Sequence, residues 1–559
     1  MLRILLVSGF CALGLAGVSG AGAAANPVQK ENDRPGDVSW AARYASGGAI
    51  EGYLSEVSLL PGGTLHLHVS TAPAARYRVN LIRLGWYAGK GGRLVGCWPS
   101  CRSDKAGETQ QAPSQDPASH MASAGWPVTD TLAVPASAVS GYWVAQLVLT
   151  SGPQAGRVRD VPFVVRQPAT ARSRVLVQVP VNTWQAYNPW GGSCLYRHPV
   201  CGQRATGVSF DRPYGWETPL QDPIHWELPL IHFLERQGVD VSYQTDADTD
   251  ADPGSLLRHR LALVAGHSEY WTKAMFDAFD TARDQGTNLA FMGANAVYWQ
   301  VRYDLGRRVI VAYKNSPDPE LDPTLQTVRF SELKPPRYEC ELVGVQHLGG
   351  AFNHMTDDYI VNPGAIGDPW FRQTGFTAGS IVRQVVSGER DDLAPNQTPG
   401  QTCGHPMTVL FEHPDSNTNN LDAAKALRYT AGSGARVFAA GSHEFAYGLD
   451  PLSHPQLADP RLQRFMVNAL DDLGRPAPPT LQLAATGRRV RITTTAPPDP
   501  RITTQVFRIS SGRPVRVTRC ASADRCLDLV PGPGLFRYKA VSVDRWGHSY
   551  ETFAALRIG

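Results

Sequence analysis

The sequence predicts a multidomain protein that combines one α/β domain with two all-β domains. Its 559 residues exceed what a single hydrophobic core normally supports. Short segments with alternating polar and apolar residues occur near both ends of the chain, which is typical of antiparallel sheets. Between them strands alternate with helices, which is typical of a parallel, doubly wound sheet. The predicted units are a signal peptide at 1–25, an N-terminal β-sandwich at 40–168, the α/β domain at 172–475 and a C-terminal β-sandwich at 480–559.

The first 25 residues are expected to direct export. Arg3 provides a positive charge, residues 4–18 form an apolar stretch, and residues 21–25 are the small residues that suit cleavage. The apolar stretch is short and contains glycines, and no other window approaches 18 apolar residues, so we expect no membrane span. We therefore predict a secreted or periplasmic protein.

Eight cysteines remain after the predicted signal peptide, and most of them lie close together in pairs. An even, clustered set in an exported protein is typical of disulfides. The neighbour scheme predicts the pairs Cys97–Cys101, Cys194–Cys201 and Cys520–Cys526, and it leaves Cys340 and Cys403.

The charge of the whole chain is small. The formal net charge is +3, and the chain has neither a basic run nor an acidic tail. This argues against nucleic acid or a charged membrane surface as the main partner.

The N-terminal sandwich is predicted from segments with a period of two residues, separated by turns every 8–15 residues. Residues 102–120 are polar and are expected to form an exposed loop. The strands that we expect here are 64–69, 77–84, 142–149 and 160–165.

The central domain is expected to resemble flavodoxin-like and glutamine amidotransferase domains, which have a doubly wound sheet. After Tyr298 the pattern becomes irregular for over a hundred residues, and we expect an insertion or cap over the sheet. The predicted strands are 175–180, 239–243, 261–265, 288–293 and 436–441, and the predicted helices are 227–237, 273–285 and 461–472. The C-terminal sandwich, of immunoglobulin or fibronectin type, is predicted from alternating segments at 489–493 and 538–543.

The segment after the predicted strand 261–265 is rich in ionisable side chains. His267, Ser268, Glu269, Tyr270 and Trp271 follow that strand at its carboxyl end, where open α/β sheets bind ligands. A structural role is the alternative, with Ser268 as a helix cap, Glu269 as a first-turn acid and Trp271 as a core anchor. The residues alone leave both interpretations open.

Other polar side chains follow neighbouring strands of the same sheet. Tyr187 lies shortly after the first strand, and Asn295 follows the strand at 288–293. His443 and Glu444 follow the strand at 436–441. Because the carboxyl ends of parallel strands meet at one edge, we expect these residues to converge with His267 and Glu269 in one crevice.

These segments resemble the large-subunit family of N,N-dimethylformamidase. The resemblance covers about residues 45–475 and leaves the C-terminal domain outside. It rests on T-W-Q-A-Y-N-x-W-G-G at 183–192, G-H-S-E-Y-W at 266–271, G-A-N-x-x-Y-W at 293–299, G-S-H-E-F-A-Y-G-L-D at 441–450 and G-W-Y-A-G-K-G-G-R-L-V at 85–95.

The resemblance implies amide hydrolysis by a mononuclear iron held by two tyrosines and a glutamate. It places Tyr187 and Glu269 as metal ligands, and His267 and Asn295 around the metal or the substrate. Glu444 falls on a further acidic position. The second tyrosine is expected from the edge of the N-terminal sandwich, where the ligand position falls on Tyr142 or on Trp143. A tryptophan cannot bind iron in this way.

Three functions remain open from the sequence. The first is a secreted amide hydrolase with Fe(III), whose preference for hard anionic ligands suits phenolate and carboxylate. The second is a zinc-dependent hydrolase that uses His267, Glu269 and His443. The third is a non-catalytic exported protein that binds glycans at a surface. The expected substrate is a small-molecule, peptide or glycan amide; a separate small subunit is implied by the family, and a homo-oligomer stays open.

Overall fold

The computed structural model shows a mixed α/β protein in which strands dominate. It describes residues 25–558 except 198–200, 216–222, 351–356, 387, 394–402, 415–422, 477–478, 496–501, 511–512, 523–524 and 545–548. All but the last residue of the predicted signal peptide therefore lie outside the described residues. No helix among the described residues is both long enough and apolar enough to span a membrane.

Two sheets pack face to face in the N-terminal part, and both are antiparallel except for the short parallel pairing of β2 with β11. One contains β1 (Glu51–Leu54), β3 (Thr64–Ser70) and β9 (Asp130–Ala133), and the other has the order β2-β11-β10-β4-β5. Alternate side chains of both sheets fill one core, in which Leu67 of β3 lies with Leu81 and Trp143. The bounds of the larger sheet are Ser58–Leu59 (β2), Val158–Val165 (β11), Gly141–Leu149 (β10), Arg76–Leu84 (β4) and Gly92–Trp98 (β5). Strands were therefore correctly predicted at 64–69, 77–84, 142–149 and 160–165. Within the predicted loop 102–120 the structure has only the short strands β6 (Lys105–Ala106) and β7 (Ser114–Gln115).

The central sheet has nine strands in the order β16-β12-β17-β19-β28-β27-β26-β23-β24. Its first five strands are parallel, and each lies where the sequence predicts a strand. They are Val241–Thr245 (β16), Val175–Val179 (β12), Leu261–Ala265 (β17), Asn288–Met292 (β19) and Arg436–Ala439 (β28). All residues of these strands are buried, which explains apolar runs such as that of β17, whereas β16 also buries Ser242, Gln244 and Thr245.

The predicted helices form α3 (Leu228–Arg236), α5 (Lys273–Asp284) and α7 (Pro460–Leu473). Two of them begin at clear caps: the Thr272 side chain accepts a hydrogen bond from the Met275 amide, and Asp459 precedes Pro460 at the first position of α7. One further helix, α2 (Val181–Tyr187), follows β12, and it is not among the helices predicted from the sequence.

The expectation of an irregular cap after Tyr298 is wrong in part. This segment provides four strands that extend the central sheet in antiparallel order: β23 (Asp357–Val361), β24 (Ile381–Val386), β26 (Met407–His413) and β27 (Ala424–Thr430). Register shifts interrupt two of their pairings, which weakens the regular alternation that would identify a strand from sequence. The same segment adds β20 (Trp299–Asp304) and β21 (Val309–Val311) of a second sheet, and a ribbon of β22 (Gln346–Gly350) with β25 (Glu389–Asp392).

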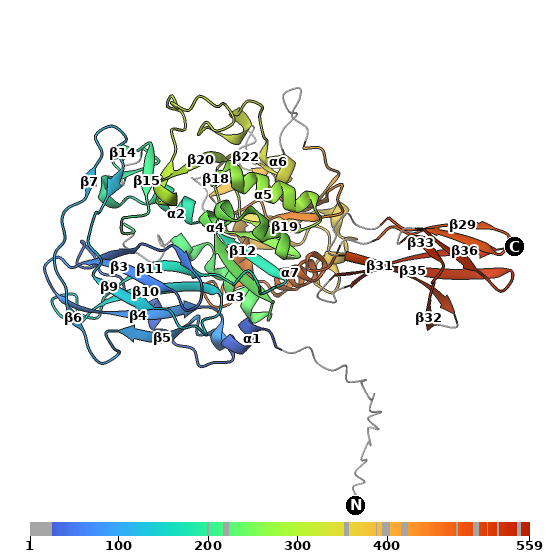
Figure 1. Ribbon diagram of the computed structural model, residues 1–559, viewed down its shortest axis with the longest axis horizontal. Coiled ribbons are helices and arrows are strands. Elements are labelled where there is room, and N and C mark those ends of the chain that lie inside the picture. The colour runs from blue at the N-terminus through green and yellow to red at the C-terminus, as the bar shows by residue number, and fades with distance from the viewer. Residues whose placement is uncertain are drawn as a thin grey trace, which may run out of the picture.

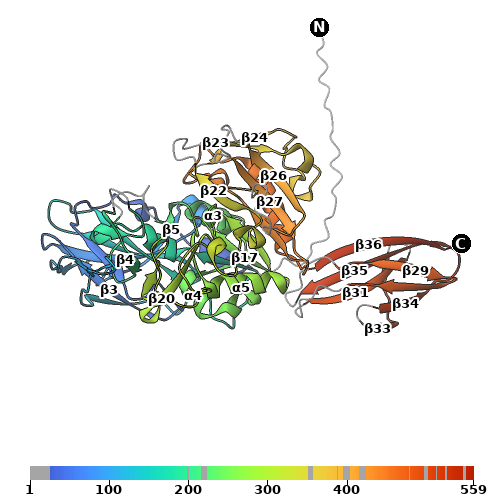
Figure 2. The ribbon, with the colours of Figure 1, turned by 90° about the horizontal axis from the view of Figure 1, so that it is seen from above.

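The C-terminal part forms two four-stranded sheets, in the orders β29-β30-β34-β33 and β32-β31-β35-β36. The bounds of the first sheet are Gln482–Thr486 (β29), Arg489–Thr493 (β30), Arg525–Leu529 (β34) and Cys520–Ser522 (β33), and those of the second are Arg513–Arg516 (β32), Ile502–Ser510 (β31), Gly534–Asp544 (β35) and Ser549–Ile558 (β36). It projects from one end of the molecule (Figures 1 and 2). Arg260 of the central domain lies 3.5 Å from Asp544 at this junction, and both side chains are buried.

Four disulfides join Cys97–Cys101, Cys194–Cys201, Cys340–Cys403 and Cys520–Cys526. The three predicted neighbour pairs are confirmed, and the two remaining cysteines pair with each other. Such a set is typical of an oxidising compartment.

Candidate functional site

The candidate site lies at the carboxyl ends of the parallel strands. Two close glycines bring the loops after β17 and β19 together, because a Cβ at Gly293 would overlap the Gly266 carbonyl oxygen. The loop after β17 carries His267 and Glu269, and the loop after β19 carries Asn295, whose φ is 49°. Convergence at this edge is what a doubly wound sheet predicts.

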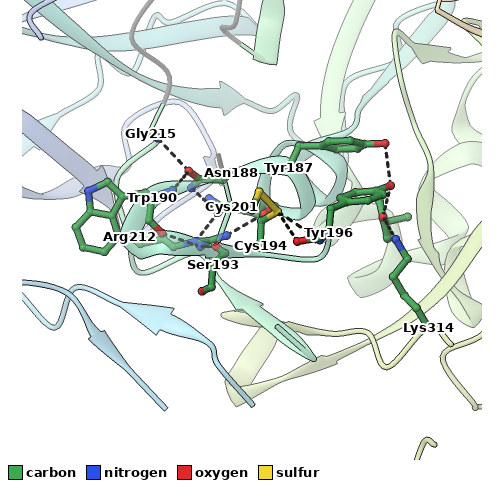
Figure 3. The surroundings of a disulfide bond; sticks show 12 residues. Tyr187, Asn188, Trp190, Ser193, Cys194, Tyr196, Cys201, Arg212, Gly215 and Lys314 are labelled. Carbon is green, nitrogen blue, oxygen red and sulfur yellow. Dashed lines mark hydrogen bonds between the residues drawn. A yellow bond between two sulfur atoms is a disulfide. The ribbon is translucent and has the colours of Figure 1, made fainter. Parts of the chain in front are cut away.

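Two phenols meet one carboxylate at this edge. Tyr187 Oη lies 2.7 Å from Glu269 Oε2, and Tyr196 Oη lies 2.8 Å from both Glu269 oxygens and 2.8 Å from Tyr187 Oη. The two tyrosine rings stack with their centroids 4.5 Å apart, next to the Cys194–Cys201 disulfide (Figure 3). The phenol oxygens of Tyr187 and Tyr196 and the Oε2 oxygen of Glu269 thus form a compact triangle.

A buried arginine holds the chain that carries the two phenols. Arg212 donates to the backbone carbonyls of Gln185, Trp190 and Ser193, and its side chain is fully buried (Figure 3). These bonds fix the end of α2 against the segment that leads to Tyr196. A cation that is bound by several carbonyls in this way determines the local backbone path.

A lysine lies on the other side of the phenols. Lys314 Nζ donates to Tyr270 Oη at 2.9 Å, and Tyr270 Oη in turn lies 2.5 Å from Tyr196 Oη. The ammonium also lies 3.7 Å from the centroid of the Tyr196 ring. Burial lowers the pKa of Lys314 to about 8.

Two imidazoles meet a second carboxylate beside this triangle. His267 Nε2 lies 2.8 Å from Glu389 Oε2, and His443 Nε2 lies 3.4 Å from the same oxygen. One ligand atom from each of these three side chains lies within 4.8 Å of the others, so the group could hold a metal ion. His267 Nε2 is also 3.5 Å from Glu269 Oε2, so the two clusters adjoin.

Asn295 links Glu389 to the sheet. Its Nδ2 donates to Glu389 Oε2 at 2.8 Å, and its backbone amide donates to Asp391 Oδ1 at 2.8 Å. Because the side-chain nitrogen Nδ2 faces the Glu389 carboxylate, the side-chain oxygen Oδ1 of Asn295 points away from it. This oxygen accepts no hydrogen bond from the described residues.

The charges of the site are set by its burial. Burial alone would raise the pKa of Glu389, but the His267 imidazolium outweighs it and holds this pKa well below its usual range. Burial would correspondingly lower the pKa of His267, and the Glu389 carboxylate raises it. Burial and the charge of Glu389 raise the pKa of Glu269. His267 and Glu389 therefore form an ion pair beside Glu269, whose carboxyl group has a raised pKa.

Burial, followed by the charge of Glu269, raises the pKa of Tyr187, Tyr196 and Tyr270 well above 10. All three phenols are therefore protonated in the protein alone. A phenolate forms here only when a strong Lewis acid replaces the proton.

Not all residues expected from the sequence join these clusters. Tyr187, His267, Glu269, Asn295 and His443 lie together as described above. Glu444 lies beside His443 at the start of a short 3₁₀ helix, and His443 is the residue that approaches Glu389.

Tyr142 lies elsewhere, packed between Trp184 and Tyr243 with its side chain buried. Trp143 packs on Phe163 in the core of the N-terminal sheets. The second phenol on Glu269 is Tyr196, which the sequence did not indicate. Its position between Cys194 and Cys201 was the available signal, because a disulfide fixes a short segment.

Glu389 was also missed. It lies on β25 in the segment expected to be irregular, and β25 is held against the sheet edge by a bridge between Arg390 and Ser442. No local pattern in the sequence marks this pairing.

The fold and the site define a mixed α/β protein with a buried cluster of ionisable side chains that could hold a metal ion. Residues 78–459 match the family model described as N,N-dimethylformamidase beta subunit-like, C-terminal. The chain belongs to this family.

No curated protein matches the chain. Solved structures that share some similarity include the chicken interferon gamma receptor alpha chain, with 18% identity, 16% of this chain and 54% of that chain covered, and a TM-score of 0.13. Another is the cell-surface chitinase ChiW of Paenibacillus sp. str. FPU-7, with 10% identity, 93% of this chain and 52% of that chain covered, and a TM-score of 0.15. The chain thus spans about half the length of each, and scores this low bear on neither fold nor function.

Proposed function

We propose that this protein is an amide hydrolase that holds Fe(III) through Tyr187, Tyr196 and Glu269. The observation that carries the proposal is the triangle of Tyr187 Oη, Tyr196 Oη and Glu269 Oε2, with sides of 2.7–2.8 Å. Neighbouring ligand atoms of an octahedral ion with bonds of about 2.0 Å also lie about 2.8 Å apart. The three oxygens therefore already have the spacing of one face of such a site.

The donor chemistry supports the same assignment. Phenolate and carboxylate are hard anionic ligands, which suit a small trivalent cation better than a soft one. Because the pKa values of both phenols are high, only a strongly Lewis-acidic ion can displace the protons of Tyr187 and Tyr196. When bound, such an ion supplies Lewis acidity, which polarises an amide carbonyl and makes water more acidic.

The second cluster provides acid–base groups next to the metal position. Glu389 is ionised, and its Oε1 lies 3.5 Å from Tyr187 Oη, one of the proposed metal ligands. The Glu389 carboxylate can therefore take a proton from a water that attacks the substrate beside the metal. His267, protonated at Nε2, can return a proton to the departing amine nitrogen. Asn295 holds Glu389 through Nδ2, and its Oδ1 is an acceptor that suits the N–H of an amide substrate.

The metal content of protein purified without an affinity tag tests the proposal. We expect about one iron per chain in the wild type and in Tyr142→Phe, and a loss of iron in Glu269→Gln and Tyr187→Phe. Tyr142 is a matched control because its buried hydroxyl has no hydrogen-bond partner among the described residues. Iron retained in Glu269→Gln would contradict the assignment.

A zinc-dependent hydrolase is the second candidate. The group of His267, Glu389 and His443 favours it, since imidazole and carboxylate are ordinary zinc ligands. The carboxylate in this group is Glu389, in place of the Glu269 expected from the sequence. Colourless protein with one zinc, lost in His443→Ala and kept in Tyr196→Phe, would favour zinc. Absence of both metals and of hydrolysis across a panel of amides would leave the non-catalytic alternative.

A further inference from the structure

The basic residues of the chain are concentrated in its C-terminal part. Residues 480–559 contain 13 Lys and Arg against 5 Asp and Glu, a formal net charge of +8, whereas the whole chain carries +3. The remaining residues are therefore acidic overall. The small net charge of the whole protein conceals this division between its parts.

Exposed arginines line the outer face of the first C-terminal sheet. In β30 (Arg489–Thr493) Arg489 and Arg491 point outward, while Val490 and Ile492 are buried in the core. Side chains two residues apart on a strand are about 6.8 Å apart on the same face. The pairing of β30 with β34 (Arg525–Leu529) places Leu529 opposite Arg489 and Leu527 opposite Arg491, and Arg525 continues the row.

Cations and aromatic rings alternate across the outer face of the second sheet. The registers of its four strands place Arg516, Phe507, Lys539 and Phe553 in one row. Lys539 lies 5.6 Å from the Phe507 ring centroid, and Phe553 is 64% exposed. The next two rows of the same face contribute Arg537, opposite Ala555, and Arg557, opposite Leu535. The strands are β31 (Ile502–Ser510), β32 (Arg513–Arg516), β35 (Gly534–Asp544) and β36 (Ser549–Ile558).

The three acids of this part that lie among the described residues are each close to a basic side chain. Asp528 binds Arg508 at 2.9 Å, Glu551 binds Lys539 at 2.7 Å, and Asp544 faces Arg260 of the central domain. Within the described residues no ion pair involves the outward-facing arginines. These are Arg489, Arg491 and Arg525 on one face and Arg516, Arg537 and Arg557 on the other.

We propose that the C-terminal part is a binding module for an acidic polysaccharide. Arginine binds carboxylate or sulfate groups in a bidentate manner, and the exposed Phe and Leu side chains offer apolar surface to sugar rings. Each exposed contact is weak, but several along one polymer add up. The inference does not depend on the proposed amide hydrolysis.

The arrangement favours a polymer over a membrane. Both outer faces are basic, and the module projects from one end of the molecule (Figures 1 and 2). A bilayer contacts only one face of such a module, so the second row of arginines would be left unused. A long acidic chain, in contrast, can engage both faces.

The test measures binding of the full chain, without its signal peptide, to immobilised polygalacturonate at about 50 mM salt. The first variant is R489Q/R491Q/R525Q, the second R516Q/R537Q/R557Q, and the third combines both. The matched control, R102Q/R372Q/R383Q, removes three exposed arginines from the rest of the chain. Circular dichroism confirms that each variant is folded. Neutral dextran, vesicles of phosphatidylcholine with one quarter phosphatidylglycerol, and single-stranded DNA serve as comparison probes.

We expect polygalacturonate to bind, and its affinity to fall at least about ten-fold between 50 and 200 mM salt, as for other polyelectrolytes. Each triple variant should weaken binding at least about ten-fold, the combined variant should abolish it, and the control should leave it within about two-fold. Tighter binding to the vesicles or to DNA than to polygalacturonate would overturn the proposal. So would an equal loss in the control, or no binding of polygalacturonate at all.

Discussion

Glu389 lies 2.8 Å from His267, although the first is on β25 and the second follows β17 of the parallel sheet. This contact joins the acid–base groups of the site to a segment that has no recognisable pattern in the sequence. It also places an ionised carboxylate next to the triangle formed by Tyr187, Tyr196 and Glu269.

Glu389→Gln tests the acid–base role of this pair. Glutamine keeps the shape and can still accept a hydrogen bond, but it cannot take a proton from water. We expect kcat for amide hydrolysis to fall by about 10²–10⁴, the usual contribution of general acid–base catalysis. Iron content should stay unchanged, which distinguishes this variant from Glu269→Gln. Joint loss of metal and activity would instead assign Glu389 to the metal.

Asn295 Oδ1 predicts a preference among substrates. Because this buried acceptor suits an amide N–H, N-methylacetamide should be hydrolysed with a kcat/KM about ten-fold or more above that of N,N-dimethylacetamide. Asn295→Ala should reduce this ratio toward one. The ratio of kcat/KM values is the readout, since it is independent of the concentration of active enzyme. A wild-type preference for the dimethyl compound would refute the assignment.

The Cys194–Cys201 disulfide is expected to position Tyr196, which lies inside the loop that it closes. A Ser substitution of both cysteines leaves this segment free to sample other conformations, so placing the phenol costs more entropy. We expect iron to be removed by a chelator at least several-fold faster. The Cys97–Cys101 double substitution is the control, and equal release from both variants would argue against a positioning role.

Glu339 predicts a dependence of stability on pH. Its side chain is buried, neither carboxylate oxygen accepts a hydrogen bond from the described residues, and burial raises its pKa to about 8. The folded protein therefore keeps a proton that the unfolded chain releases near pH 4.3, so this residue costs stability as pH rises from about 4.3 to 8.

Glu339→Gln lacks this cost. Its advantage in the free energy of unfolding over wild type should grow from pH 5 to pH 8, to the order of a few kcal/mol. Urea unfolding at both pH values measures it. A pH-independent advantage of Glu339→Gln would show that this carboxyl is ionised in the folded protein.

Most of the parallel strands could be predicted from the sequence because their buried residues form largely apolar runs such as 261–265. The convergence of His267, Glu269 and Asn295 followed, since each comes directly after one of these strands. Tyr187 was located by the same reasoning together with the family motif.

The remaining site residues depend on long-range contacts. Tyr196 reaches Glu269 because a disulfide and Arg212 shape a segment that has no regular structure. Glu389 reaches His267 through a short ribbon whose pairing with β22 contains a register shift. Neither contact leaves a periodic signal in the chain. The antiparallel strands after Tyr298 pair largely with neighbours in the sequence, but register shifts in two of these pairings interrupt the alternation that would mark the strands.

The visible absorption spectrum of the iron-loaded protein tests the central claim most directly. Phenolate bound to Fe(III) gives a charge-transfer band, so wild type and Tyr142→Phe should be coloured alike. Tyr196→Phe and Tyr187→Phe should each lose or shift the band. Iron-containing protein whose spectrum is the same in all four forms would contradict a centre built on these two phenols.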